Sequence, residues 1–304
     1  MTGEILDGRY VVGAKQRETV TTTRFLAFDA KTTTSVEVEA LDVCYRAGSR
    51  AARALLHEAE LAARVDHPNV AVPLDIGKLE DGTPYVVRRC TTGETLTERL
   101  GLTGALPIAD VLRVGLDLLS VLAAAHEAHV VHGAVHPDHV FLVEHEGVLL
   151  QSMISGFGRE PRDRDDEVLG FSSIVFSSPE RIDGCSASVA SDIYGVAALL
   201  FVAATGMAPF VSAHSRVPKA LLRVLVRALD SDPERRFPTA RAMMHALLVV
   251  RVELGSAYAP AEESVPPPPQ SVSGVFPCAR SSDEEEAPPT RPSAPEAKRL
   301  ARAS

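Results

Sequence analysis

A ten-residue run without a charged side chain, from Ile193 to Val202, restricts the possible folds of this chain more than any other feature. On a helix the run is apolar around its whole circumference, which predicts a helix buried on every side. Amphipathic spacing predicts further helices over residues 110–129, 221–229 and 239–252, the last with Thr239 as its N-cap.

The first 90 residues carry a different pattern. One helix, predicted over residues 51–65, ends before Pro68, because proline disfavours helical geometry in the residue before it. The fold class is therefore α+β, with a small β-rich lobe over residues 1–90 and a larger helical lobe over residues 91–255. Stretches rich in Val and Thr predict strands over residues 10–12, 24–28, 35–41, 70–74 and 85–88.

Residues 256–304 do not have the composition of a packed domain. They hold 10 of the 21 prolines and an acidic run, Asp283 to Glu286, with few large apolar side chains. Such a segment cannot bury enough apolar surface to offset its chain entropy, so we predict a disordered C-terminal tail. The four prolines from Pro266 to Pro269 are either a polyproline II ligand for a partner or part of a solvated tail.

Charge, apolar runs and cysteines indicate which partners and cellular locations are disfavoured. A net charge of −9 disfavours binding to nucleic acid or to an anionic membrane surface. The longest apolar run, Val196 to Ala204, is too short to span a bilayer, and residues 1–9 contain no apolar core of a signal peptide. The four cysteines are far apart, as expected of reduced thiols. We therefore predict a cytoplasmic protein.

Eight segments resemble the motifs of bacterial Ser/Thr protein kinase domains, in the same order and at suitable spacing. The resemblance covers roughly residues 7–252 and implies a two-lobed protein kinase-like fold. The segments are LDGRYVV, LAFDAKTTTSVEVEAL, HEAELAARVDHPNVAVPLDIG, HGAVHPDHVFL, SGFG, SSPERIDG, SDIYGVAALLFVAATGMAPF and ALDSDPERRFPTA.

The resemblance also implies where a nucleotide would bind, and this chain departs from the family there. Phosphoryl transfer needs a glycine-rich loop, a phosphate-binding Lys, a proton-accepting Asp and metal ligands. The three glycine positions hold Arg17, Thr19 and Thr22. Glu39 stands at the Lys position, and Glu37 stands where a small Ala touches the adenine ring. A carboxylate at residue 39 would repel a triphosphate.

The remaining catalytic positions are also replaced. Ala134 stands for the proton-accepting Asp, His136 for the loop Lys, His139 for the metal-binding Asn and Gly156 for the main magnesium ligand. His132 shares the loop with the other two histidines, but their side chains need not converge on a metal. The resemblance therefore predicts a degenerate kinase, a pseudokinase, with no metal site and no cofactor. Residual ATP binding without Mg²⁺ is the alternative.

Other family positions keep their residues, and these have architectural roles. The resemblance implies a stacked pair, His132 and Phe157, and a carboxylate, Asp192, that braces the catalytic loop. It also implies a helix glutamate, Glu58, and an ion pair between Glu180 and Arg236 that fastens one turn to the C-lobe.

Arg88 occupies the position just before the hinge of the family. One hypothesis has it pointing into the former nucleotide pocket and pairing with Glu39, Glu58 or both. The other has it turning outward to solvent, as long basic side chains often do. The charged segment from Arg159 to Phe171 predicts a solvated loop.

The leading functional hypothesis is an inactive module that binds or scaffolds another protein in signalling. The partner would bind the C-lobe near the shortened segment after Phe210, or the proline-rich tail. The alternative is a family member that still binds ATP with weak or unorthodox phosphotransfer. A third hypothesis, an ordinary protein kinase, rests on the family resemblance alone, and fold does not settle function.

Overall fold

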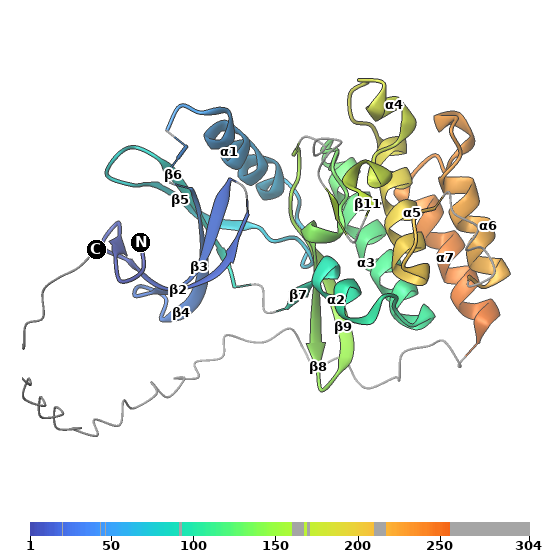
Figure 1. Cartoon of the computed structure of the whole chain (residues 1–304), viewed down its shortest axis with the longest axis horizontal. Coiled ribbons are helices and arrows are strands. Elements are labelled where there is room, and N and C mark those ends of the chain that lie inside the picture. The colour runs from blue at the N-terminus through green and yellow to red at the C-terminus, as the bar shows by residue number, and fades with distance from the viewer. Residues whose placement is uncertain are drawn as a thin grey trace, which may run out of the picture. The chain divides into compact units, whose positions relative to one another are not determined.

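The computed structural model of the chain describes residues 1–19, 21–42, 44–45, 47–90, 93–159, 167–168, 171–209 and 217–255. The tail predicted over residues 256–304 and the segment from Phe210 to residue 216 lie outside the described residues. An N-terminal lobe built on a β-sheet precedes a C-terminal lobe built mainly of helices (Figure 1). The predicted α+β architecture is confirmed.

The N-lobe contains a six-stranded antiparallel sheet in the order β1-β2-β3-β4-β6-β5. Strands β3 and β4 pair without interruption over their whole length. The elements of this lobe are β1 (Ile5–Leu6), β2 (Tyr10–Glu18), β3 (Thr22–Asp29), β4 (Thr34–Leu41), α1 (Arg50–Ala63), β5 (Pro73–Lys78) and β6 (Pro84–Arg89).

Strand β4 has one apolar face and one acidic face. Val36, Val38 and Ala40 belong to an apolar cluster with residues of the neighbouring strands. Glu37 and Glu39 lie on the opposite face, because side chains alternate along a strand. Both glutamates are nevertheless buried, with exposed fractions of 8% and 1%. Buried carboxylates need partners, so this face must contain compensating charges.

Helix α1 packs against the sheet. It begins after Ser49, whose side chain accepts a hydrogen bond from the third helical backbone N–H. Leu55 of the helix belongs to one apolar cluster with Val86 of β6. The buried face of α1 also carries Glu58, which is 1% exposed. The amphipathic pattern of the helix thus directs a carboxylate into the interior.

Helix α5 (Val189–Thr205) is the buried centre of the C-lobe. Every residue from Ser191 to Thr205 is buried, so the prediction of a helix covered on all sides is confirmed. Helices α3, α6 and α7 contact it (Figure 1). The C-lobe elements are β7 (Glu94–Thr95), α2 (Leu96–Thr103), α3 (Ile108–Glu127), β8 (Val140–His145), β9 (Val148–Ile154), β10 (Glu167–Val168), β11 (Phe171–Ser172), α4 (Pro179–Ile182), α5, α6 (Lys219–Ala228) and α7 (Ala240–Leu254), with 3-10 turns η1 (Pro137–His139), η2 (Ser173–Phe176) and η4 (Pro233–Arg235).

Two local predictions were wrong. The strand predicted over residues 70–74 begins instead at Pro73, because Val70 packs into the C-lobe core and makes only an isolated bridge to Ile154. The C-lobe also contains a three-stranded sheet, β7-β8-β9, that the helical patterns did not predict. Glu146 and Gly147 both have positive φ and connect β8 to β9, which is the geometry of a tight hairpin turn.

Candidate functional site

The site begins with the strand register. Arg24 of β3 lies directly across from Glu39 of β4. In the next strand pair, Glu39 faces Val86 and Glu37 faces Arg88. Because residues two apart share a face of a strand, Arg24, Glu39 and Arg88 project from the same face of the sheet. The period of two therefore brings two arginines and a carboxylate together.

Arg88 lies inside the lobe and pairs with both glutamates. Its Nη2 is 3.3 Å from Oε1 of Glu58, and its Nε is 3.5 Å from Oε2 of Glu39. Its Nη1 donates a hydrogen bond of 3.0 Å to the carbonyl of Ala71. The side chain is 1% exposed, so it points inward. This is the first of the two orientations that the sequence allowed for Arg88.

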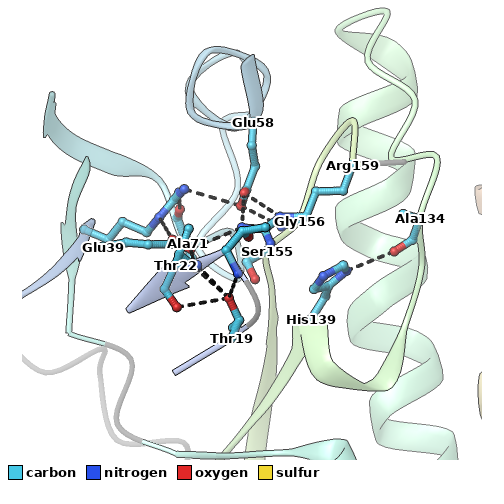
Figure 2. A network of polar contacts seen from close by, with 12 residues as sticks. Thr19, Thr22, Glu39, Glu58, Ala71, Ala134, His139, Ser155, Gly156 and Arg159 are labelled. Carbon is cyan, nitrogen blue, oxygen red and sulfur yellow. Dashed lines mark hydrogen bonds and ion pairs between the residues drawn. The ribbon is translucent and has the colours of Figure 1, made fainter. Parts of the chain in front are cut away.

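Arg159 is a third cation of this cluster, and the prediction of a solvated loop is wrong for it. Its Nε donates to Oε2 of Glu58 at 2.7 Å, and its Nη2 donates to Oε1 of Glu39 at 3.2 Å (Figure 2). Its side chain is only 24% exposed, because two buried carboxylates attract it. Gly158 precedes it with φ of +70°. Residues 160–166 of the same predicted loop lie outside the described residues.

These five side chains form one network, which we call the arginine–glutamate cluster: Arg24, Arg88 and Arg159 with Glu39 and Glu58. Burial raises the pKa of Glu39, but Arg24, Arg159 and Arg88 outweigh that effect and hold the pKa well below its usual range. Both glutamates are buried, and three cations oppose two anions. The space beside the Lys position is thus occupied by protein charge.

The loop at the glycine positions is closed on itself. The backbone N–H groups of Thr19, Thr21 and Thr22 all donate within the turn, to the carbonyl of Thr22 or the hydroxyl of Thr19. The hydroxyl of Thr22 donates to Oε1 of Glu39 at 2.9 Å. In a phosphate-binding loop such N–H groups would face the ligand. Here they already have partners within the protein.

Two arginines of the N-lobe lie over one aromatic ring of the C-lobe. Arg17 lies 5.7 Å from the ring centroid of Phe141, and Arg24 lies 5.4 Å from it. Arg17 also makes an ion pair of 2.6 Å with Glu98 of α2. Phe141 is 4% exposed, so these side chains cover it. Cation–π contacts of this kind are favourable by about 0.5–2 kcal/mol each.

The two positions that the family resemblance assigns to metal binding hold His139 and Gly156. The His139 ring donates from Nδ1 to the carbonyl of Ala134 at 3.0 Å (Figure 2). Burial, together with Arg159 and the neighbouring histidines, lowers the pKa of His139 well below its usual value, so the ring is neutral. Gly156 has φ of +88°, and its backbone N–H donates to Oε1 of Glu58 at 2.9 Å. Neither residue presents a carboxylate to a cation.

The rings of the three histidines of the loop, His132, His136 and His139, lie close together. The ring centroids of His132 and His139 are 6.3 Å apart, and those of His136 and His139 are 5.8 Å apart. Burial lowers the pKa of His132. Among the residues that the structure describes, no group of three or more His, Cys, Asp or Glu side chains is placed to hold a metal ion.

The residues to which the family resemblance assigns architectural roles make contacts within the C-lobe. The rings of His132 and Phe157 pack against each other with centroids 4.6 Å apart and planes tilted by 47°. Asp192 accepts hydrogen bonds from the backbone N–H groups of His132 and Gly133, at 2.9 and 2.8 Å, and lies 2.9 Å from His126. Asp192 of helix α5 therefore fastens the loop that carries Ala134.

An ion pair between the fully buried Arg236 side chain and Glu180, which is 17% exposed, fastens the turn at Glu180 to the rest of the C-lobe. Nη1 and Nη2 of Arg236 donate to the two carboxylate oxygens of Glu180 at 2.7 and 2.8 Å. The same guanidinium donates to the carbonyls of Asp230 and Ala190. This forked geometry is the strong form of a charged hydrogen bond.

The comparisons with known proteins agree with the fold and the motifs. A family profile described as "Protein kinase domain" matches residues 25–250. The serine/threonine-protein kinase PrkC of Bacillus subtilis is 28% identical over 270 residues, covering 80% of this chain and 40% of that protein. The serine/threonine-protein kinase PknL of Mycobacterium tuberculosis is 28% identical over 234 residues, covering 76% and 56%. The chain thus spans about half the length of these relatives, or less.

A solved structure supports the same fold. The crystal structure of the Mycobacterium tuberculosis PknI kinase domain matches with a TM-score of 0.66 and 21% identity, covering 83% of this chain and 99% of that one. At this identity the likeness shows the fold alone. None of the helices that the structure describes combines the length and apolar character needed to cross a bilayer.

Proposed function

We propose that this chain, which belongs to the protein kinase domain family, is a pseudokinase that does not transfer phosphate and acts by binding another protein. The names of its relatives describe serine/threonine kinases. Function depends on the site and not on the fold. The observation that carries the proposal is the buried arginine–glutamate cluster at the nucleotide-binding positions.

The cluster opposes nucleotide binding in two ways. Glu39 is held ionised by three arginines and the Thr22 hydroxyl, so its negative charge remains where a triphosphate would bind. The arginines that could attract phosphate are already paired with Glu39 and Glu58. A nucleotide would have to break these buried pairs, which is costly because it leaves desolvated charges without partners.

The metal and proton-transfer positions support the same conclusion. Magnesium in kinases is held by carboxylate and amide oxygens, and the hydroxyl proton is accepted by an aspartate. Here these positions hold the neutral ring of His139, the backbone of Gly156 and the methyl group of Ala134. The loss of both functions would remove several orders of magnitude in rate.

The architectural interactions support a binding role. A chain without phosphotransfer has no chemical need to keep the Asp192 brace or the Glu180–Arg236 pair, yet both have good geometry. They maintain the C-lobe as a folded surface. We therefore propose that the selected property is the shape of the domain, which a protein partner in signalling recognises.

Radiolabel transfer from [γ-³²P]ATP, with Mg²⁺ or Mn²⁺, tests the absence of catalysis. The acceptors are the chain itself and a generic basic protein, and the matched control is Glu39→Gln, which alters the centre of the cluster. We expect equal background incorporation from both proteins. Incorporation by the wild type above background, whether or not the Glu39→Gln variant retains it, would contradict the proposal.

The binding role needs a separate experiment. Cross-linking and mass spectrometry in the source cells, with the whole chain and with a chain ending at residue 255, should give the same stoichiometric partner if the folded domain is recognised. Loss of that partner from the shortened chain would assign recognition to residues 256–304. No reproducible partner for either chain would contradict this half of the proposal.

A further inference from the structure

We propose that two side-chain bridges hold the N-lobe and the C-lobe in one fixed arrangement, doing the work that a bound nucleotide does when it contacts both lobes. The inference concerns conformation and goes beyond the proposed function. It holds whether or not the chain has a protein partner, and it predicts a preset arrangement without any ligand.

The first bridge is Arg159. It lies in the C-lobe sequence, one residue after Gly158, and reaches the N-lobe carboxylates Glu58 of α1 and Glu39 of β4 (Figure 2). Both carboxylates are buried, and although burial opposes the charge of Arg159, they raise its pKa above its usual range. The backbone N–H of Gly156 adds a second contact to Glu58 at 2.9 Å. Helix α1 is therefore tied to the C-lobe by charge.

The second bridge is Arg17, a side chain of the N-lobe that contacts the C-lobe. Arg17 of β2 makes an ion pair of 2.6 Å with Glu98 of α2. Arg17 and Arg24 also lie over the ring of Phe141 in β8. Glu98 is half exposed, so water screens this pair and the first bridge should dominate.

Charge balance makes Arg159 the removable member of the arginine–glutamate cluster. With Arg159, the cluster has three cations and two anions; without it, Arg24 and Arg88 still pair with Glu39 and Glu58. Loss of Arg159 therefore leaves no buried carboxylate without a cation. Substitution at residue 159 should remove the charged contact of the first bridge and leave each lobe folded, which allows a clean test.

Double electron–electron resonance between spin labels on the two lobes measures the arrangement directly. Glu60→Cys on α1 and Val249→Cys on α7 are exposed labelling sites in a full-length chain whose native cysteines are replaced by serine. We expect one narrow distance distribution, unchanged by 5 mM ATP with Mg²⁺. Arg159→Met should broaden it, Arg17→Met should broaden it less, and the double variant should broaden it most.

The controls separate charge from structure. Arg159→Lys keeps one cation and should keep most of the narrow distribution. Arg223→Met removes an exposed pair with Glu253 inside the C-lobe and should change nothing. A broad distribution in the wild type, or a narrow one in the Arg17→Met/Arg159→Met double variant, would overturn the inference. A narrow distribution in a chain that transfers phosphate would contradict the proposed function and leave this inference intact.

Discussion

The imidazole ring of His139 fills the space that a side chain on Gly156 would need. A Cβ atom at residue 156 would lie 2.5 Å from Nδ1 of His139, and the backbone there has φ of +88°. The residues at the two positions that the family resemblance assigns to metal binding are therefore sterically dependent on each other. Restoring an aspartate at one of them is incompatible with the present residue at the other.

This relationship predicts the result of a reversion. Gly156→Asp alone should destabilise the domain by roughly 2–4 kcal/mol, because it combines overpacking with backbone strain. Adding His139→Asn should recover part of that loss, since the shorter side chain opens the space. Denaturant unfolding of the wild type, both single variants and the double variant measures the coupling. Additive effects of the two changes would contradict the steric account.

A lysine at residue 39 would not restore the kinase site. Glu39→Lys replaces the anion that Arg24, Arg88 and Arg159 share and leaves Glu58 as the counter-ion of four cations. We expect a loss of about 3–5 kcal/mol in the free energy of unfolding, the range for breaking buried pairs. Thermal unfolding checks it, with Glu39→Gln as a milder control. Unchanged stability of Glu39→Lys would show that the cluster is not formed in solution.

Asp117 of α3 should make stability depend on pH. Its carboxylate accepts a hydrogen bond of 2.7 Å from the backbone N–H of Ser152, but burial raises its pKa from 3.8 to about 6. Because the folded state binds this proton more tightly than the unfolded state, protonation of Asp117 adds to the free energy of unfolding. This contribution is complete below about pH 4 and is lost as pH rises through 6.

The variant Asp117→Asn isolates this effect. It keeps an acceptor for Ser152 without an ionisable group, so it should be more stable than the wild type at pH 7 by roughly 1–3 kcal/mol. The difference should shrink toward pH 4. Chemical denaturation at several pH values measures it. A difference that is constant with pH would exclude Asp117 as its source.

The Glu180–Arg236 pair should be a major contributor to the stability of the C-lobe. The Arg236 side chain is fully buried, whereas its neighbour Arg235 is 73% exposed. We expect Arg236→Met to cost about 3–5 kcal/mol and Arg235→Met less than about 0.5 kcal/mol. Arg236→Lys should also be costly, because an ammonium group cannot reproduce the forked contact. Equal effects of the changes at residues 235 and 236 would contradict this assignment.

Residue patterns predicted the fold well because they reflect its packing. The apolar run in α5 predicted a helix buried on every side, and the Val- and Thr-rich stretch over residues 35–41 predicted strand β4. The hairpin β8–β9 was missed because it lies between helices α3 and α4 in a part of the chain with mainly helical patterns. The Glu146–Gly147 turn between two apolar runs was the available signal.

The candidate site was only partly visible in the sequence. The replacements at residues 39, 134, 139 and 156 follow from motif positions, and the inward Arg88 was one of two stated alternatives. Arg24 and Arg159 were missed, because their roles depend on strand register and on a contact between segments 101 residues apart. An uncompensated pair of buried carboxylates, Glu39 and Glu58, was the signal that further cations had to be nearby.

Thermal unfolding of the full chain with ATP, with and without Mg²⁺ or Mn²⁺, is the most direct test of the claim that protein side chains occupy the nucleotide site. A ligand at 100 times its Kd stabilises a protein by about 2.7 kcal/mol, which would raise Tm by roughly 5–10 °C for a domain of this size. We expect no rise in Tm at 5 mM ATP under any of these conditions. A rise in the Tm of the wild-type chain that depends on the ATP concentration would contradict the claim that side chains occupy this site.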